Sequence, residues 1–394
     1  MKDLVKKTRS AIKYYVAYMG FYVMERLCPK SSNIWCFSTW KNYPHTMDNL
    51  RAVFEAVKDD PEIIKIILLQ GQKKPEWQVE GVNIRFVQEV SLSGVFYLSV
   101  AKVYLMGTSL RGFTNFHALV GNKHQIIQLW HGIPLKRIGK LFPPEKFWEE
   151  ETKKYSATVC SSPSDQEFMQ QAFDPLSIDR VWQTGLPRND FILATDEQLP
   201  NDYYTELEKI RDQVAGRFLI LYAPTWRDSV ENVYQFSAEE QSELDALLAR
   251  HNAVLAIRGH ANVRSKVDYQ DVGALNNIIY VNDVPDANLL LKEAGALITD
   301  YSSIYIDYLI TDRPIVYFTY DIDRYINERG FLYELVEAFV CDPAIGFKQL
   351  LTDIESAITE GVKDRARYHR VKSLFHQHAD SCALNVVNKI KALN

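Results

Sequence analysis

The sequence predicts an α/β protein with two similar halves, each built on a parallel sheet. Short runs of β-branched and aromatic residues alternate with helical patterns from Ser31 onward, and this alternation restarts after Gly185–Asp190. The chain has 394 residues, whereas one domain typically has about 150 residues. We therefore expect two Rossmann-type domains, over residues 31–185 and 186–361, with a helical segment at each end of the chain.

The elements follow in order from these runs. In the first half, strands are expected over Asn33–Ser38, Ile63–Gln70, Val82–Val87, Lys102–Met106, Gln125–Leu129 and Ala157–Cys160, with helices over Met47–Lys58 and Ser164–Phe173. In the second half, strands are expected over Arg217–Tyr222, Ala253–Arg258, Asn277–Val281, Ala296–Thr299 and Pro314–Phe318. Residues 362–394 have a helical period and are expected to cross back and brace the first half. Because open parallel sheets bind ligands beyond the carboxyl ends of their strands, two facing halves predict a substrate cleft between them.

Composition excludes several classes of protein. The chain has 45 Lys and Arg against 50 Asp and Glu, a net charge of −5, so no global basic field indicates a nucleic-acid partner. The hydrophobic share of 47% excludes wholesale disorder. The five cysteines are widely spread and none has C-x-x-C spacing, which argues against a disulfide framework or a zinc site. We expect a reducing, cytosolic compartment.

Residues 1–30 are expected to form a helix at a membrane surface. A basic cluster between Lys2 and Lys13 precedes the uncharged aromatic run Tyr14–Met24. At 1.5 Å per residue this run reaches about 16 Å, roughly half of a ~30 Å hydrocarbon core, so it is too short to span a bilayer. Its composition favours an interfacial helix on anionic headgroups. The alternative is a helix that packs on the body of the protein through its aromatic face.

In the first half, the residues capable of chemistry follow the strand predicted at Gln125–Leu129. His131 comes two residues after this strand, in a turn with Gly132 and Pro134, and Lys136 follows. An imidazole at a strand end can take a proton from an attacking hydroxyl near neutral pH, so we expect His131 to be a general base. The alternative is that His131 merely hydrogen-bonds its loop.

In the second half, two strand ends each deliver a guanidinium. Thr225 and Arg227 follow one strand, and Arg258 and His260 follow the next. A planar, permanently charged Arg suits a diphosphate, whereas structural ion pairs are the competing explanation.

A third strand in this half runs into Asp300-Tyr301-Ser302-Ser303, with Asp307 beyond. Ser302 and Ser303 are expected at a helix N-terminus, where amides and hydroxyls can bind phosphate, although an ordinary helix cap gives the same pattern.

Several other motifs are missing or weak. The sequence contains neither G-x-x-x-x-G-K-[ST] nor G-x-G-x-x-G, so the P-loop and dinucleotide fingerprints are absent. Asp321-Ile322-Asp323 imitates a metal-binding D-x-D triplet, but a solvated turn is the commoner cause. No His/Cys cluster has zinc spacing. We expect no cofactor, and a divalent metal requirement stays open.

Taken together, the motifs resemble the CDP-glycerol glycerophosphotransferase family of teichoic-acid and capsule polymer synthesis. The resemblance covers roughly Ser31–Gly330 in the family's order. One departure is Ala261, where the family usually has Pro after the histidine of R-x-H-P. The long amino-terminal extension of the polymerase members is also absent, which favours a single-module, primase-like member. The motifs that carry the resemblance are Trp130-His131-Gly132-x-Pro134-Leu135-Lys136, Gly185-x-Pro187-Arg188-Asn189-Asp190, Tyr222-Ala223-Pro224-Thr225-Trp226-Arg227, Arg258-Gly259-His260 and Asp300-Tyr301-Ser302-Ser303 with Asp307-Tyr308.

The resemblance implies a GT-B-like pair of Rossmann-type domains and a membrane-associated enzyme on the cytoplasmic face of the cell membrane. It implies transfer of glycerol phosphate from CDP-glycerol, or ribitol phosphate from its ribitol counterpart, to a lipid-linked or polymer acceptor with release of CMP. Two alternatives remain, a GT-B glycosyltransferase acting on a nucleotide sugar and a non-catalytic member that binds polymer or membrane. The expected catalytic residues are His131 and His260, and the expected substrate-binding residues are Lys136, Arg188, Thr225, Arg227, Arg258, Asp300, Ser302, Ser303 and Asp307.

Overall fold

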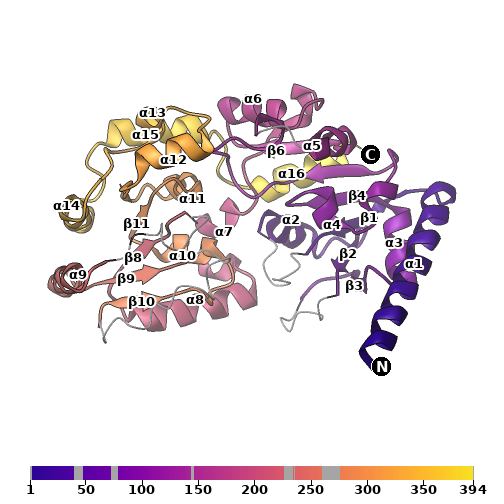
Figure 1. The fold of residues 1–394 in the computed structure, drawn as a ribbon, viewed down its shortest axis with the longest axis horizontal. Coiled ribbons are helices and arrows are strands. Elements are labelled where there is room, and N and C mark those ends of the chain that lie inside the picture. The colour runs from indigo at the N-terminus through magenta and orange to yellow at the C-terminus, as the bar shows by residue number, and fades with distance from the viewer. Residues whose placement is uncertain are drawn as a thin grey trace. The chain divides into compact units, whose positions relative to one another are not determined.

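The computed structural model describes residues 2–39, 48–71, 79–142, 146–225, 234, 236–259 and 276–393. Their contacts divide the chain into two units (Figure 1). Unit 1 comprises Met1–His131, Gly139–Asp190 and His378–Asn394, and unit 2 comprises Gly132–Ile138 and Phe191–Gln377. The short segment after His131 thus belongs to unit 2, although the strand before it belongs to unit 1.

Within the described residues, unit 1 contains a seven-stranded parallel sheet with the order β3-β2-β1-β4-β5-β6-β7. Runs of Ile, Val and Leu form these strands because both faces of the sheet are covered and the side chains are buried. The order reverses between β1 and β4, and such a switch point is where open α/β sheets bind ligands. The strands are β1 (Ser31–Phe37), β2 (Ile64–Leu69), β3 (Ile84–Gln88), β4 (Ala101–Met106), β5 (Gln125–Gln128), β6 (Ala157–Cys160) and β7 (Val181–Gln183).

Unit 2 contains a five-stranded parallel sheet with the order β10-β9-β8-β11-β12 among the residues that the structure describes. One face packs through Ile220, Leu255 and Ile298 against α9 (Ala238–Arg250) and α14 (Phe347–Thr359). Its strands are β8 (Phe218–Tyr222), β9 (Ala253–Ile257), β10 (Ile278–Tyr280), β11 (Ala296–Thr299) and β12 (Ile315–Tyr317).

The predicted α/β class and the predicted strands are confirmed, with ends that differ by two residues at most. The helices expected at Met47–Lys58 and Ser164–Phe173 are α2 and α6. Strand β7 was not predicted, because only two apolar residues, Val181 and Trp182, stand between the polar residues Arg180 and Gln183, and so short an apolar run does not stand out. The helices of the described chain are α1 (Lys2–Leu27), α2 (Asn49–Val57), α3 (Leu92–Val100), α4 (Leu110–Phe113), α5 (Lys146–Glu151), α6 (Pro163–Ala172), α7 (Asn189–Leu193), α8 (Asn201–Val214), α9 (Ala238–Arg250), α10 (Ala287–Glu293), α11 (Ile304–Tyr308), α12 (Ile322–Arg329), α13 (Leu335–Ala338), α14 (Phe347–Thr359), α15 (Arg365–Phe375) and α16 (Cys382–Lys391).

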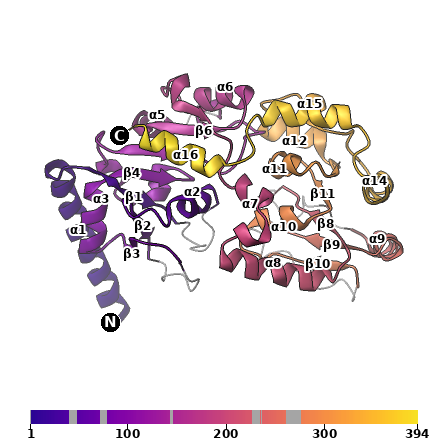
Figure 2. The same cartoon turned by 180° about the vertical axis from the view of Figure 1, so that it is seen from behind.

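The C-terminal segment is two helices, where the sequence predicted one. Helix α15 lies in unit 2, whereas α16 lies in unit 1 and packs against α2, as Figure 2 shows from behind. The carboxylate of Asp190 accepts hydrogen bonds from the backbone N–H groups of Cys382 and Ala383, both at 2.9 Å. Asp190 therefore satisfies two of the amides that the first turn of α16 leaves without a partner in the helix.

Helix α1 lies beside α3 (Figures 1 and 2). One face of α1 is packed on unit 1, where Ala17 and Phe21 are buried and the Phe21 ring stacks on Phe116 with centroids 5.2 Å apart. None of the helices in the described part of the chain has an apolar stretch that could span a bilayer.

A buried ionic cluster fixes the C-terminal end of α1. The Glu25 carboxylate lies 2.9 Å from His124 Nε2 and 2.7 Å from Lys30 Nζ, and all three side chains are at most 4% exposed. The Nδ1 of His124 lies 2.7 Å from the carbonyl oxygen of Ala101. Burial alone would raise the pKa of Glu25, but the hydrogen bonds and charges of His124 and Lys30 outweigh it and hold the pKa below its usual value.

Candidate active site

The loop that carries His131 has an unusual backbone. It follows β5 and passes through Trp130 at φ +51° and Gly132 at φ +143°. A left-handed φ is uncommon for a large side chain and persists only where the surroundings fix it. The Trp130 ring is buried, packs edge-to-face on Phe173 and stacks on the His131 ring with centroids 4.2 Å apart.

One hydrogen bond determines how His131 can act. Its Nδ1 lies 3.2 Å from the carbonyl oxygen of Gly107, the residue that follows β4. Because a carbonyl only accepts, Nδ1 carries the proton and the lone pair of the neutral ring lies on Nε2. His131 thus stands at the carboxyl end of the sheet beside the switch point between β1 and β4.

The electrostatic surroundings favour the neutral ring. The surrounding protein desolvates the imidazole and lowers the pKa of His131, and the nearby Arg188 cation lowers it further, whereas the hydrogen bond with the Gly107 carbonyl opposes both. His131 remains exposed, so water offsets part of the desolvation. A neutral imidazole at neutral pH is the form that can accept a proton.

Arg188 lies next to His131, although the two are 57 residues apart in the sequence. Its Nη1 donates to the carbonyl oxygen of His131 at 2.9 Å and forms an ion pair with Asp48 at 3.1 Å. The structure therefore brings together two of the predicted site residues in unit 1. Asp48 and its neighbour Asn49 were not predicted, because a polar pair at the start of the apolar helix α2 is by itself an ordinary helix cap.

In unit 2, Asp300 joins two strand ends at the carboxyl edge of the sheet. Its side chain is buried, and its Oδ1 accepts hydrogen bonds from the backbone N–H groups of Thr225 at 2.8 Å and Tyr301 at 2.6 Å. The ends of β8 and β11 are thereby held together. The structure thus brings together two of the predicted site residues, Asp300 and Thr225, and the Asp300 carboxylate holds the backbone at this edge of the sheet.

Arg258 leaves the end of β9 with its guanidinium held in place. Its Nη1 donates to the carbonyl oxygens of Val284 at 2.8 Å and Val281 at 3.3 Å. The next residue, Gly259, donates its N–H to the side-chain oxygen of Asn282 at 2.7 Å. A fixed permanent cation at a strand end is compatible with a diphosphate ligand.

Ser302 and Ser303 precede a short helix. Helix α11 has five residues, so the macrodipole contributes little and the local amides and hydroxyls are the relevant donors. The Ser302 Oγ accepts only a long hydrogen bond of 3.4 Å from the N–H of Ile304, and the Ser303 side chain makes no capping bond. Asp307, on the same helix, is buried.

Lys136 joins unit 2 through two contacts. Its backbone forms an antiparallel bridge with Phe331, and its Nζ lies 5.0 Å from the centroid of the Tyr325 ring. Tyr325 in turn stacks on Tyr301, with centroids 4.2 Å apart. Lys136 is therefore connected, through two aromatic rings, to the strand end that carries Asp300.

Arg227 and His260 lie outside the described residues, as does Ala261. Within the described part of the chain, no group of three His, Cys, Asp or Glu side chains could hold a metal ion. The Asp321 carboxylate accepts a hydrogen bond from the Tyr301 hydroxyl at 3.2 Å, which is a structural use of that residue.

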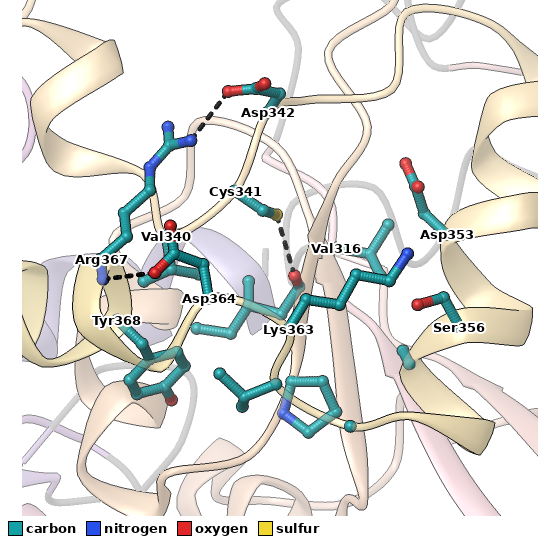
Figure 3. Close-up of a pocket in the computed structure, with 15 residues that line it drawn as sticks. Val316, Val340, Cys341, Asp342, Asp353, Ser356, Lys363, Asp364, Arg367 and Tyr368 are labelled. Carbon is teal, nitrogen blue, oxygen red and sulfur yellow. Dashed lines mark hydrogen bonds and ion pairs between the residues drawn. The ribbon is translucent and has the colours of Figure 1, made fainter.

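Unit 2 also contains a cavity of about 290 Å³ that is separate from these residues (Figure 3). It lies against Ile315 at the amino end of β12, which is the opposite edge of the sheet from Asp300. Arg367, at its rim, is held by Asp342 at 2.8 Å and by the carbonyl oxygen of Phe339 at 2.9 Å. No predicted site residue lines this cavity.

Curated proteins of teichoic acid synthesis are similar to the chain over much of its length. The chain is 25% identical to a teichoic acid glycerol-phosphate transferase of Staphylococcus aureus over 390 residues, which cover 95% of both chains. It is 28% identical to the ribitol-phosphate polymerase TarL of the same species, over 66% of this chain and 48% of TarL.

Among solved structures, the wall teichoic acid polymerase TagF superposes with a TM-score of 0.77 at 21% identity, over 100% of this chain and 98% of that chain. A histidine-to-asparagine variant of TagF soaked with CDPG superposes with a TM-score of 0.74 at 23% identity, over 100% of this chain and 98% of that one. The fold is GT-B-like. The model of CDP-glycerol:poly(glycerophosphate) glycerophosphotransferases matches residues 20–391, and the chain belongs to that family.

Proposed function

We propose that this glycerophosphotransferase moves glycerol phosphate from CDP-glycerol to a lipid-linked acceptor at a membrane surface, with release of CMP. Membership of the family supports the reaction type and the donor. The match over 95% of a teichoic acid glycerol-phosphate transferase supports a primase-like enzyme that extends a short acceptor. Glycerol and ribitol donors give acceptor products of different mass, so mass analysis distinguishes them.

In the proposed reaction, an acceptor hydroxyl attacks the phosphorus that bears glycerol. The oxygen–phosphorus bond to the acceptor forms, the bond between this phosphorus and the CMP oxygen breaks, and the hydroxyl proton passes to Nε2 of His131. The observation that carries this role is the hydrogen bond between His131 Nδ1 and Gly107, because it places the basic lone pair on Nε2. The lowered pKa keeps this lone pair available at neutral pH.

The proposal assigns the donor diphosphate to the carboxyl edge of the unit 2 sheet. Arg258 and Lys136 bring permanent or near-permanent positive charge there, and Ser302 and Ser303 bring hydroxyl donors. Negative charge accumulates on CMP as it leaves, and fixed donors aimed at developing charge are usually the largest catalytic contribution. Arg258 fits this requirement because two carbonyl oxygens already fix its guanidinium. His260, Arg227 and Arg188 remain proposed members of the site on the strength of their motifs.

The membrane part of the proposal rests on the outward face of α1. At 100° per residue, Tyr14, Ala17, Tyr18, Phe21 and Glu25 lie on the packed side of this helix, whereas Ile12, Tyr15, Val16, Met19 and Val23 lie on the opposite side. These five outward residues are 42–66% exposed. Helix α3, which packs beside α1, adds Leu92 at 89% and Phe96 at 45% exposure.

Exposed apolar side chains gathered on neighbouring helices are typical of a membrane or partner surface. The sequence places basic residues before this face, and cations near an anionic bilayer favour binding. The sequence allows two interpretations of α1, a helix packed on the protein and a helix at a membrane surface. One face of α1 packs on unit 1, and we propose that the opposite face meets the membrane.

Product analysis tests the reaction. The purified chain is incubated with CDP-glycerol or CDP-ribitol and a short lipid-linked acceptor, and the products are identified by mass. We expect CMP and an acceptor heavier by one glycerol phosphate with CDP-glycerol, and little product with CDP-ribitol. Release of a nucleoside diphosphate from a nucleotide sugar would instead indicate a glycosyltransferase, and no turnover with any donor would indicate a binding protein.

A further inference from the structure

A buried asparagine connects the two loops that carry His131 and Arg188. Asn49 is the first residue of α2, and its side chain is completely buried. Its Nδ2 donates to the carbonyl oxygens of Leu129 and Trp130, both at 3.1 Å, and its Oδ1 accepts from the backbone N–H of Arg188 at 3.0 Å. The amide of Asn49 thus uses both of its N–H groups and its oxygen in hydrogen bonds. Their partners lie about 80 and 140 residues away in the sequence.

The residue before Asn49, Asp48, holds the Arg188 side chain against the histidine loop. Asp48 pairs with Arg188 Nη1 at 3.1 Å, and the same Nη1 donates to the carbonyl oxygen of His131 at 2.9 Å. Three successive carbonyl oxygens of the histidine loop are therefore held from one side. Asn49 holds those of Leu129 and Trp130, and Arg188, which Asp48 and Asn49 fix, holds that of His131.

The histidine loop requires such support because of its backbone. The left-handed φ of Trp130 is costly for a residue with a large side chain, and the φ of Gly132 is open essentially to glycine alone. Without the Asn49 donors, the carbonyl groups of Leu129 and Trp130 would lose their partners in a buried region, and the loop could relax to an ordinary conformation. The ring of His131 would then leave its position 3.2 Å from Gly107.

We infer that Asp48 and Asn49 are positioning residues, which hold the His131 loop in the conformation that presents Nε2 to the acceptor hydroxyl. The inference rests on the proposed role of His131 as the base. Neither residue touches the reacting atoms; each acts through the histidine loop, Asn49 directly and Asp48 through Arg188.

Gln166 on α6 offers a matched control. Its Nε2 also donates to two carbonyl oxygens, those of Val181 at 2.7 Å and Ile178 at 3.2 Å, and its Oε1 also accepts one hydrogen bond, from Gln183. It lies in unit 1 but contacts neither loop of the site. Asn49→Asp and Gln166→Glu therefore remove the same kind of amide donor, and Asn49→Ala with Gln166→Ala forms a second pair if the acidic variants fold poorly.

The experiment compares these variants in the full chain by melting temperature, steady-state kinetics and ¹⁵N NMR of histidine-labelled protein without substrate. The His131 ring signal is identified by its loss in His131→Ala. We expect the wild type and Gln166→Glu to show the Nδ1–H form, and Asn49→Asp to show a mixture of ring tautomers. We expect kcat for CMP release to fall about 10²-fold in Asn49→Asp, as small misplacements of catalytic groups do, with the KM for CDP-glycerol within about twofold of the wild type.

The inference would be overturned if Asn49→Asp and Gln166→Glu lost kcat equally at equal melting temperature and both kept the Nδ1–H form of His131. That result would show that Asn49 only stabilises the fold. A wild type that releases no CMP from CDP-glycerol would overturn the proposed function instead, while the tautomer measurement would still decide the positioning role.

Discussion

His131 Nδ1 and the carbonyl oxygen of Gly107 lie 3.2 Å apart, and this contact assigns the basic position of the ring to Nε2. The partner is a backbone carbonyl at the end of the neighbouring strand, where serine hydrolases use a carboxylate. A carbonyl orients the ring without adding a negative charge that would stabilise the imidazolium. The site therefore combines a fixed tautomer with a lowered pKa.

The first prediction concerns His131 itself. His131→Gln should lower kcat for CMP release by about 10²–10⁴-fold, the usual value of general-base assistance, and should leave the KM for CDP-glycerol nearly unchanged. The residue is exposed on a loop, so the melting temperature should stay close to that of the wild type. Steady-state kinetics and thermal unfolding of the same preparation check both. A variant with near-normal kcat would remove His131 from the mechanism.

The second prediction is a pH dependence that involves Arg188. As the proposed base, His131 must be neutral, so kcat/KM should fall as pH drops through the lowered pKa of His131, which lies below the ordinary histidine value of about 6.5. The free energy of unfolding should also fall as pH drops. The pKa of His131 is lower in the folded state, so the unfolded chain binds this proton first. Arg188→Gln removes a cation that lowers the pKa of His131, so the acid limb should move to higher pH. If the acid limb of kcat/KM lies at the same pH in the wild type and in Arg188→Gln, the charge of Arg188 does not act on the pKa of His131.

The third prediction tests the serines of unit 2. Replacement of Ser302 and Ser303 by Ala should weaken inhibition by CMP at least tenfold, since a hydrogen bond to a charged group contributes roughly 1.5–3 kcal/mol. Ser237 is the matched control, because its side chain caps α9 in the same unit through the N–H of Glu240. Ser237→Ala should lower the melting temperature without changing CMP inhibition. If the double variant behaves like this control, the two serines are ordinary caps.

The fourth prediction concerns the cluster that holds α1. Glu25→Leu leaves His124 and Lys30 buried beside an apolar side chain, and such a broken pair costs about 3–5 kcal/mol of unfolding free energy. The contribution of Glu25 is present above its unfolded pKa of 4.5 and is lost as pH falls through the lower folded value. Urea unfolding should therefore show that Glu25→Leu lowers the free energy of unfolding strongly at pH 7. The difference from the wild type should be smaller below pH 4. Glu206→Leu, which breaks the exposed pair with Lys209, should change stability by less than about 1 kcal/mol.

Sequence patterns predicted the strands because both sheets are parallel and buried, so continuous apolar runs mark them. The same reasoning placed His131, Arg258 and Asp300 at strand ends. It could not find Asn49, because a polar residue at the start of a helix is an ordinary cap until its partners are known, and those partners lie about 80 and 140 residues away. Nor could it place Lys136 against Tyr325, a contact between residues 189 positions apart.

The fifth prediction separates the two faces of α1. Deletion of residues 1–30 would remove Phe21 and Glu25 together with the outward face, so a loss of membrane binding could reflect unfolding. Substitutions on the outward face avoid this problem. The triple variant Tyr15→Ser, Val16→Ser and Met19→Ser changes only exposed side chains. It should keep the melting temperature of the wild type and lose most of its sedimentation with anionic liposomes, because each inserted side chain contributes in proportion to its apolar area.

The control for this prediction removes apolar surface elsewhere. Val336 and Ile345 of unit 2 are 70% and 71% exposed, and their double substitution by Ser should leave liposome binding unchanged. Moderate salt should release the intact chain from liposomes only in part. Salt screens the attraction between the basic residues and anionic lipids beyond about 10 Å, but it leaves the inserted apolar area unaffected. Activity with a lipid-linked acceptor in liposomes should fall with binding, whereas activity with a short soluble acceptor should persist in the triple variant, because the substitutions lie outside the catalytic loops. Equal sedimentation of the triple variant and the wild type would show that another surface of the protein meets the membrane.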